Sequence, residues 1–271
     1  MNRKQFILDG LDIRRSTGLE IGPLASPVVA KDEGVIFYVD YADTTFLRNR
    51  FKDDPNVDVS KIVNIDAIWG NKTLLEAMDG KLVDYIIAAH VIEHVPDLIT
   101  WLSELHSVLR ERGQVRLVVP DRRYSFDYLR QETRLSDILN AYLLKTRVPL
   151  VHEVLDCCLN QAQIDAATAW RGEINPYALK KDFTFDGAMW LAKDIIANGT
   201  YHDIHCWVFT PHSFATLCCE LAKVDLLQFA CQHFVDTQYG QLEFYVALEA
   251  SRDKNLTVES WAKMAGKVRQ A

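Results

Sequence analysis

Short apolar runs alternate with amphipathic stretches along the first 120 residues of the chain. Between the runs, leucines at positions 98, 102, 105 and 109 follow one face of a helix, which Gly113 is expected to end. An order of strand, helix, strand predicts a parallel sheet covered by helices on both faces. The five runs with the length and composition of strands lie at residues 18–22, 35–40, 61–66, 83–89 and 114–120.

The pattern changes after residue 120. Residues 121–200 are rich in helix formers and show no strand-like alternation, so we expect a helical insertion or lid of roughly three helices. Two apolar runs near the end of the chain, at 226–236 and 242–250, are separated by a short turn and predict an antiparallel hairpin. We therefore expect a single domain over residues 1–250.

The tail at 251–271 is predicted to be helical, with Trp261, Met264 and Val268 on one side, packed on the body or on a partner.

Composition narrows the class of protein. The chain is 49% hydrophobic and 25% charged, as is usual for a soluble globular protein, and its net charge is −7. No dense basic run is present, which argues against a nucleic-acid partner. The sequence shows neither a signal peptide nor a run long enough to span a membrane, so we expect a cytoplasmic protein. The six cysteines lack C-x-x-C spacing and are expected to be buried thiols.

Ionisable residues gather where the predicted strands end. His90 closes the fourth run, and Glu93 and His94 follow it at once. Asp40 closes the second run, 18 residues after Gly22, which is about where an acid binds ribose hydroxyls in nucleotide-binding folds. Ligands of open α/β sheets bind at the carboxyl ends of the strands, so these side chains mark the expected site.

An ordered set of motifs carries a family resemblance. The stretches "LEIGP", "YVDYAD", "VNIDAIW", "VDYIIAAHVIEHVPD", "LRERGQVRLVVPDRRY" and "HCWVFTPHSF" together resemble the class I S-adenosylmethionine-dependent methyltransferases. The similarity is greatest to the small bacterial members found beside or fused to glycosyltransferases in polysaccharide gene sets. It covers about residues 18–120 and 202–249. The chain departs from the family's glycine-rich loop by carrying Leu24 and Ser26 where later glycines stand.

The resemblance implies a Rossmann-like class I methyltransferase sheet with S-adenosyl-L-methionine as cofactor. In that family the first loop approaches the methionine part of the cofactor, the acid after the second strand binds the ribose, and the third strand end meets the adenine. His90 would face the cofactor or the acceptor, whereas Glu93 and His94 would fix the loop. The residues implied to bind the cofactor are Glu20, Gly22, Pro23, Asp40, Tyr41, Asp66, Ala67 and His90.

Methyl transfer to an alcohol also needs a group that receives the proton. His205 is the first choice because imidazole titrates near neutral pH, and Asp121 and His90 are further candidates. His202, Asp203 and His205 could instead bind a divalent cation or form a hydrogen-bonded turn. Spacing identifies no third or fourth ligand, so no metal is predicted. Arg122 and Arg123 either bind an anionic group of the acceptor or are solvated.

Three functions remain open at this point. The first is a methyltransferase acting on a hydroxyl or amine of a small glycan, nucleotide sugar or related metabolite, as a homodimer or with a glycosyltransferase partner. The second is an inactive scaffold with an eroded glycine loop. The third, a nicotinamide-dependent oxidoreductase, is disfavoured because the chain lacks G-x-G-x-x-G. The insertion's aromatic residues could line the acceptor site or form its own core; they are Tyr124, Phe126, Tyr128, Trp170, Tyr177 and Trp190.

Overall fold

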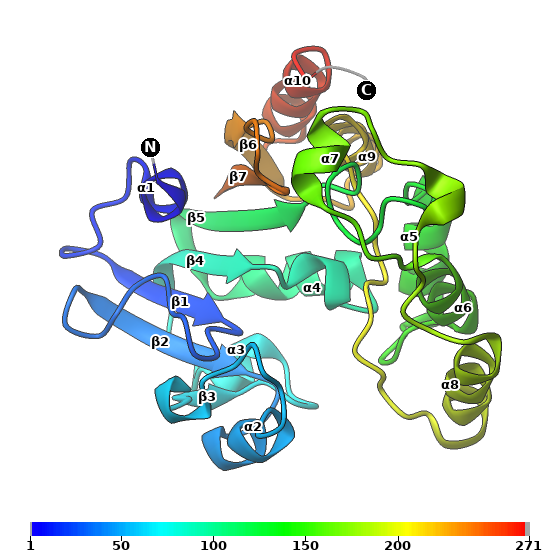
Figure 1. Ribbon diagram of the computed structural model, residues 1–271. Coiled ribbons are helices and arrows are strands. Elements are labelled where there is room, and N and C mark those ends of the chain that lie inside the picture. The colour runs from blue at the N-terminus through cyan, green and yellow to red at the C-terminus, as the bar shows by residue number, and fades with distance from the viewer. Residues whose placement is uncertain (1, 269–271) are drawn as a thin grey trace.

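A seven-stranded sheet forms the centre of the protein, whose computed structural model describes residues 2–268 (Figure 1). The strand order is β3-β2-β1-β4-β5-β7-β6. Strands β1 to β5 are parallel, β7 is antiparallel to β5, and β6 is antiparallel to β7. The predicted fold class, a parallel Rossmann-like sheet ending in an antiparallel hairpin, is thereby confirmed. The strands are β1 (Thr17–Ile21), β2 (Val35–Asp40), β3 (Ala67–Ile68), β4 (Val83–Ala89), β5 (Leu109–Pro120), β6 (Phe229–Val235) and β7 (Glu243–Ala250).

Polar residues at the helix starts define where several helices begin. The Asp97 carboxylate accepts a hydrogen bond from the backbone of Thr100 at the start of α4, and Thr210 caps α9 ahead of Pro211. The helices are α1 (Arg3–Leu8), α2 (Thr44–Arg50), α3 (Leu74–Ala77), α4 (Leu98–Ser107), α5 (Leu135–Leu144), α6 (Val151–Asn160), α7 (Ala166–Trp170), α8 (Phe185–Asn198), α9 (Pro211–Lys223) and α10 (Lys254–Ala265). Single 3-10 turns occur at Val59–Lys61, Ile92–His94 and Pro176–Ala178.

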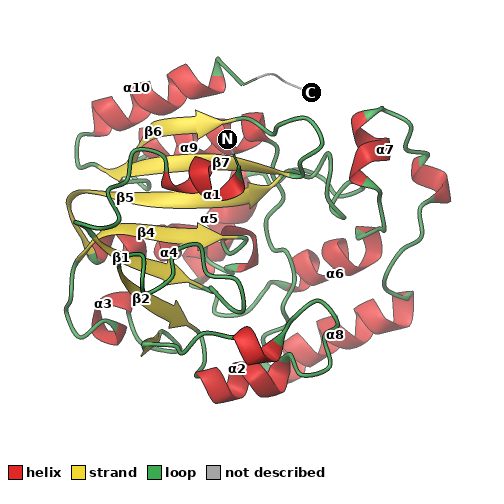
Figure 2. Cartoon of the chain, turned by 60° about the vertical axis from the view of Figure 1, so that its left-hand side comes forward, coloured by secondary structure: helices red, strands yellow, loops and turns green. Residues whose placement is uncertain are grey.

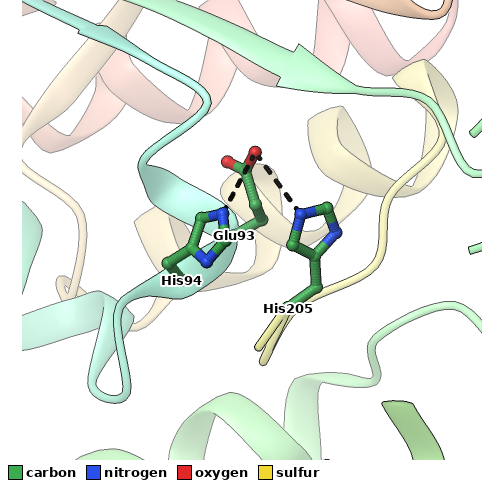
Figure 3. A group of neighbouring side chains, drawn as sticks. All are labelled: Glu93, His94 and His205. Atoms are coloured by element: carbon green, nitrogen blue, oxygen red, sulfur yellow. Dashed lines mark ion pairs between the residues drawn. The ribbon is translucent and has the colours of Figure 1, made fainter. Parts of the chain in front are cut away.

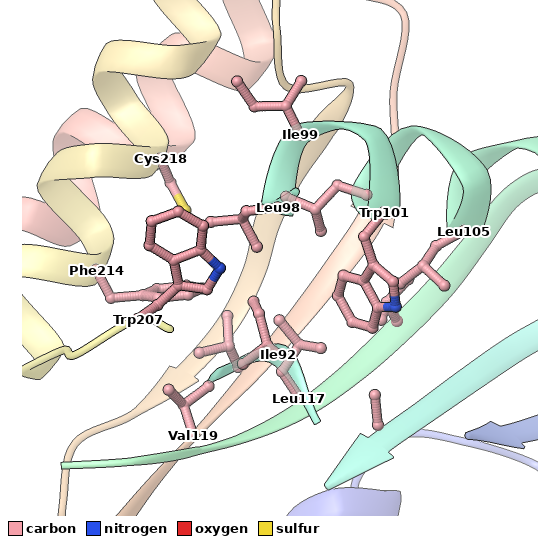
Figure 4. Close-up of a cluster of buried hydrophobic side chains, with 14 of the residues drawn as sticks. Ile92, Leu98, Ile99, Trp101, Leu105, Leu117, Val119, Trp207, Phe214 and Cys218 are labelled. Carbon is pink, nitrogen blue, oxygen red and sulfur yellow. The ribbon is translucent and has the colours of Figure 1, made fainter. Parts of the chain in front are cut away.

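Two hydrophobic cores lie on opposite faces of the sheet. Along β4, Ile86 and Ala88 belong to the larger core, and Tyr85 and Ile87 to the smaller one, as the two-residue period of a strand requires. In the larger core, the indole of Trp207 lies among side chains of α4 and α9 (Figure 4). Its Nε1–H donates to the carbonyl of Val95 at 2.6 Å, so the polar atom of this buried side chain is paired.

The third strand lies later in the chain than the sequence predicts. The expected strand at 61–66 is wrong, and the paired residues are Ala67 and Ile68. Its backbone groups are used elsewhere, because Val63 N–H donates to the carbonyl of Leu24 and Ile65 N–H donates to the hydroxyl of Thr44. This run therefore lies against the loop after β1 and the start of α2, and the chain enters the sheet only at Ala67.

The fifth strand begins earlier than predicted, at Leu109 instead of residue 114. The helix before it ends at Ser107, so Leu109 opens the strand instead of closing the helical stripe. Gly113 consequently lies within β5 and does not end a helix. Arg112 has a φ of +58°, and the pairing with β4 shifts register here, which identifies a local irregularity that the leucine spacing conceals.

The insertion contains four helices, α5 to α8, where roughly three were expected. Both views place α6, α7 and α8 on the side toward which the arrows of β4 and β5 point (Figures 1 and 2). Buried side chains of the insertion, among them Ile138, Val154 and Ile195, belong to the same core as the sheet. The insertion is therefore packed on the body, next to the carboxyl edge of the sheet.

The C-terminal helix α10 packs on α9 and β6 of the same chain. Trp261 is fully buried, and its Nε1–H donates to the carbonyl of Phe229 at 2.8 Å. Val268 is buried as well, while residues 269–271 of the predicted tail lie outside the described part of the chain. All six cysteines are free thiols, and five are buried. Within residues 2–268, none of the helices combines the length and apolar character needed to cross a bilayer.

Candidate functional site

The loop after β1 has the left-handed turns expected of a glycine-rich loop. Gly22 has a φ of +63°, and its N–H donates to the carbonyl of Val39 at 2.9 Å. Leu24 has a φ of +44°, a region that glycine enters freely and that costs other residues about 1–2 kcal/mol. Pro23 lies between them, and its carbonyl accepts a hydrogen bond from Ser26. The loop therefore turns sharply even where leucine replaces glycine.

Glu20 supports this loop from beneath. Its side chain is buried, and the carboxylate accepts hydrogen bonds from the backbones of Val28 at 2.7 Å and Val29 at 3.2 Å. Burial raises the pKa of Glu20 to about 7 against the lowering effect of these two bonds. The Glu20 side chain thus holds the chain at Val28 and Val29 close to the end of β1.

Asp40 and Tyr41 follow β2 at the same edge. The Asp40 carboxylate is buried and accepts a hydrogen bond from the backbone of Tyr41 at 2.7 Å. Burial, and to a smaller extent the nearby charge of Asp203, raise the pKa of Asp40 to about 6. Tyr41 is half-exposed, with its ring edge-on to Phe46. A desolvated carboxylate beside an exposed ring is suited to hydroxyl groups and a flat heterocycle.

Asp66 and Ala67 lie at the start of β3. The Asp66 carboxylate accepts a hydrogen bond from the backbone of Tyr38 at 2.8 Å and pairs with Lys31 at 2.6 Å. Ala67 pairs with Val39 in the sheet. Two partners within the protein therefore already engage the Asp66 carboxylate, and its predicted contact with adenine stays a prediction.

His90 ends β4 in a left-handed conformation, with a φ of +55°. Its Nε2 lies 2.6 Å from the Glu243 carboxylate, and its Nδ1 lies 3.3 Å from Glu93. Burial lowers the pKa of His90, but the hydrogen bond with Glu243 and the nearby carboxylate of Glu93 outweigh it and raise the pKa to about 9. Arg3 and Tyr245 also donate to Glu243, so this imidazole is held between two carboxylates.

Beyond His90, side chains from two distant parts of the sequence converge: Glu93 and its neighbour His94 meet His205, and we refer to these three residues as the Glu93 cluster (Figure 3). The Glu93 carboxylate is fully buried. Its Oε1 lies 4.0 Å from Nε2 of His94 and 3.9 Å from Nε2 of His205. Glu93 and His94, expected only to fix a loop, thus share one site with the predicted base.

Carboxylates orient both histidines of the cluster. Nδ1 of His205 lies 2.6 Å from Asp127, which in turn forms a buried ion pair with Arg130 at 2.9 Å. Nδ1 of His94 lies 2.9 Å from Asp203. Each imidazole therefore presents its Nε2 toward Glu93.

Other predicted residues lie outside the cluster. The buried Asp121 carboxylate accepts hydrogen bonds from Arg123 and from the hydroxyl of Thr237. Arg122 donates to the carbonyl of Tyr128. His202 pairs with Asp194 at 2.8 Å. These contacts within the protein occupy the carboxylate and both arginines, so we do not carry Asp121 forward as a base.

The aromatic residues of the insertion divide into two groups. The Phe126 ring lies 4.5 Å from that of His205, and Tyr124 stacks on Trp170 with ring centroids 3.9 Å apart. Tyr177 is fully exposed and Trp190 is largely exposed. Phe126 therefore borders the Glu93 cluster, whereas Tyr177 and Trp190 face solvent.

Three carboxylates that contact these histidines were not predicted as their partners. Asp127 lies in the insertion, where no motif marks it, and only its 2.6 Å contact identifies it as the partner of His205. Glu243 could have been noticed as an acid inside the otherwise apolar run "LEFYVALEA". Asp203 was considered only with its neighbours at 202 and 205, not with His94.

A separate hollow of about 430 Å³ lies beside α4, bordered by Leu75, Ile99, Leu226 and Phe229 among others. Its lining comes from α3, the far side of α4 and the start of β6. The residues predicted from the sequence lie elsewhere, at the carboxyl edge, so we place the functional site there.

Comparisons with known proteins identify no family for this chain. No family model matches the sequence, and no curated protein is significantly similar to it. Among solved structures, the CurJ carbon methyltransferase is 13% identical over 90% of this chain with a TM-score of 0.40, and the chain spans 51% of its length. A SAM-dependent methyltransferase from Methanosarcina mazei is 12% identical, covering 89% of this chain and 94% of its own, with a TM-score of 0.43.

A protein from Rhodobacter sphaeroides assigned to the zinc-dependent alcohol dehydrogenases is 13% identical, covering 91% of this chain and 88% of its own, with a TM-score of 0.47. Methyltransferase and dehydrogenase names thus occur together at similarly low identity. The activity must therefore be argued from this chain's own residues.

Proposed function

We propose that the protein is an S-adenosyl-L-methionine-dependent methyltransferase. The observation that carries the proposal is the pairing of two strand ends: the left-handed loop at Gly22 after β1 and the buried Asp40 after β2. These ends adjoin the point where the strand order reverses, between β1 and β4, which is where such sheets bind nucleotides. Hydroxyl groups of a bound ribose would donate to the desolvated Asp40 carboxylate, so the residues present fit the cofactor.

The cofactor would supply an electrophilic methyl group, and the protein's task is to align the acceptor and exclude water. Asp203 links the two halves of the site, because its charge acts on Asp40 while its carboxylate holds His94. The acceptor side is therefore proposed to be the Glu93 cluster, adjacent to the ribose position. In the metal-free protein, Nε2 of His205 would receive the acceptor's proton, with Asp127 fixing the ring.

The acceptor is proposed to be a hydroxyl or amine of a small glycan, nucleotide sugar or related metabolite. Phe126 at the cluster and the stacked pair of Tyr124 and Trp170 supply aromatic surface in the insertion. A cytoplasmic location, a homodimer and a glycosyltransferase partner belong to the same proposal, and the glycosyltransferase partner rests on the motif resemblance alone.

Turnover tests the proposal. Wild-type protein is incubated with S-adenosylmethionine and a panel of nucleotide sugars and oligosaccharides, and S-adenosylhomocysteine is measured. We expect acceptor-dependent product formation that His205→Ala lowers by about 100-fold or more, the size of a general base effect, while affinity for S-adenosylhomocysteine stays within about twofold. Normal turnover by the variant would remove His205 from the mechanism, and cofactor binding without turnover on any acceptor would favour a scaffold.

A further inference from the structure

Glu93 is an unusual carboxylate. The side chain is fully buried, and neither of its oxygens forms a hydrogen bond with any residue in the described range 2–268. Buried carboxylates are strongly disfavoured unless they are paired or bind a metal ion. His90 approaches Oε1 to 3.3 Å, an ion-pair contact without hydrogen-bond geometry. The structure thus aims an unsatisfied anionic ligand into a space lined by imidazoles.

The distances in the Glu93 cluster match a shared ion better than direct hydrogen bonds. Nε2 of His94 and Nε2 of His205 lie 4.0 and 3.9 Å from Oε1 of Glu93, beyond hydrogen-bond reach. Two donors bound to one ion at about 2.1 Å can be separated by at most about 4.2 Å. All three donor atoms lie within 4.8 Å of one another, so a small inward movement would bring them onto one ion.

The second ring nitrogens follow the pattern of metal-binding histidines. Such histidines usually donate their other N–H to a carboxylate, which fixes the tautomer and orients the ring. Here Nδ1 of His205 is hydrogen-bonded to Asp127 at 2.6 Å, and Nδ1 of His94 lies 2.9 Å from Asp203 in an ion-pair contact without hydrogen-bond geometry. With the proton on Nδ1, the lone pair of each Nε2 is free to bind a cation. A separate carboxylate thus faces Nδ1 of each ring, which leaves both Nε2 atoms on the side of Glu93.

We propose that Glu93, His94 and His205 bind one divalent transition-metal ion, with zinc as the first choice. Two imidazoles and one carboxylate form a three-ligand site that leaves a position open, as in catalytic zinc centres. His94 is the most exposed member, with 29% of its side chain accessible, and provides the approach from solvent. The ligand set differs from the group at 202, 203 and 205 considered from the sequence, because His202 pairs with Asp194.

This inference does not depend on the proposed methyltransferase activity. If the ion is bound, Nε2 of His205 is a ligand and cannot also receive a proton. The ion would then polarise an acceptor hydroxyl held at the open position, and the proton would leave to solvent water instead of to His205. Metal binding and cofactor binding are measured separately, so either can fail without the other.

The test is metal titration of the full-length protein after treatment with a chelator. Calorimetry with Zn²⁺ and visible absorption with Co²⁺ are expected to show one ion per chain, with a Co²⁺ spectrum lacking the intense near-ultraviolet bands of thiolate ligation. His94→Ala and Glu93→Gln should each weaken binding by at least about 100-fold, and Asp127→Asn by about 10–100-fold. His202→Ala, a histidine paired outside the cluster, should leave binding unchanged.

Three results would overturn the proposal: no saturable binding to the wild-type chain, thiolate bands in the Co²⁺ spectrum, or equal loss in the His202 variant. Circular dichroism of each variant establishes that it is folded, and the wild-type titration is decisive even if a variant is not. Absence of zinc binding combined with normal affinity for S-adenosylhomocysteine would leave the proposed function standing and reduce the cluster to an ion-pair network. Zinc binding without affinity for S-adenosylhomocysteine would support the metal site and contradict the proposed function.

Discussion

Two buried carboxylates, Glu20 and Asp40, support the cofactor side of the site in different ways. Glu20 binds two backbone N–H groups and holds the loop after β1. Asp40 receives one backbone hydrogen bond and stays poorly solvated. For both, burial is the largest influence on the pKa and raises it, to about 7 for Glu20 and to about 6 for Asp40. Burial therefore disfavours the ionised form of each carboxyl group, and hydrogen-bond donors to the carboxylate stabilise that form.

Glu20 makes stability depend on pH. Its pKa is about 7 in the folded protein and 4.5 as the reference for the unfolded chain, so the unfolded state binds fewer protons between these values. The free energy of unfolding should then fall as pH rises from about 4.5 to about 7, by about 3 kcal/mol at most. Urea unfolding at about pH 5 and about pH 7.5 measures this slope.

Glu20→Gln should make the slope shallower without abolishing it, because burial also raises the pKa of Glu153 to about 7. The exposed Glu111→Gln is the matched control and should leave the slope unchanged. An identical slope in wild type and Glu20→Gln would show that Glu20 ionises as freely in the folded protein as in the unfolded chain.

Asp40→Ala tests the ribose position. Removing an ionised acceptor of hydroxyl groups should weaken binding of S-adenosylhomocysteine by about 1–3 kcal/mol, while the fold stays intact. Wild-type affinity should also fall as pH drops below about 6, since the protonated carboxyl accepts hydrogen bonds poorly. Asp32→Ala, which removes an exposed acid in the segment before β2, is the control. Unchanged affinity in Asp40→Ala would remove Asp40 from the site.

Elements that carry strong local signals were predictable from the sequence. Asp97 and Thr210 mark helix starts, and the apolar run at 83–89 predicts a central strand, because these signals come from residues that are neighbours in the chain. The third strand was misplaced because the hydrogen-bond partners of Val63 and Ile65 are distant in sequence: Leu24 in the loop after β1 and Thr44 at the start of α2. Long-range partners of this kind leave no local pattern.

The site was predictable only in part, for the same reason. His90 and Asp40 stand at strand ends and His205 stands beside a motif, so the sequence could propose them. The carboxylate that orients His205 comes from Asp127, 78 positions away, and Glu243 reaches His90 from the closing hairpin. Spacing cannot reveal a contact that exists only after the insertion and the hairpin have folded onto the edge of β4.

At the level of elements, α10 is part of the body. Its Trp261 is fully buried against β6, so Trp261→Ala should lower the free energy of unfolding by about 3–5 kcal/mol. Trp190 on α8 is 63% exposed, and Trp190→Ala should change it by no more than about 0.5 kcal/mol. Urea unfolding of both variants measures the contrast. Equal, small effects would mean that the tail helix is not docked in solution.

The whole molecule combines the proposed nucleotide-binding edge with a second centre beside it. The sheet delivers Gly22, Asp40 and His90 to its carboxyl edge, and the insertion adds Asp127 and Phe126 next to His205. Because the insertion shares the core of the sheet, the second centre is fixed relative to the first. That arrangement suits a reaction that joins a bound cofactor to a separately held acceptor.

The most direct test of this account is a calorimetric titration of the wild-type protein with S-adenosylhomocysteine, with NAD as the comparison ligand. We predict binding of one S-adenosylhomocysteine per chain with a Kd on the order of 1 μM and no saturable heat with NAD. Saturable NAD binding without S-adenosylhomocysteine binding would contradict the proposed cofactor and favour an oxidoreductase. No binding of either ligand would contradict a cofactor site at the Gly22 loop altogether.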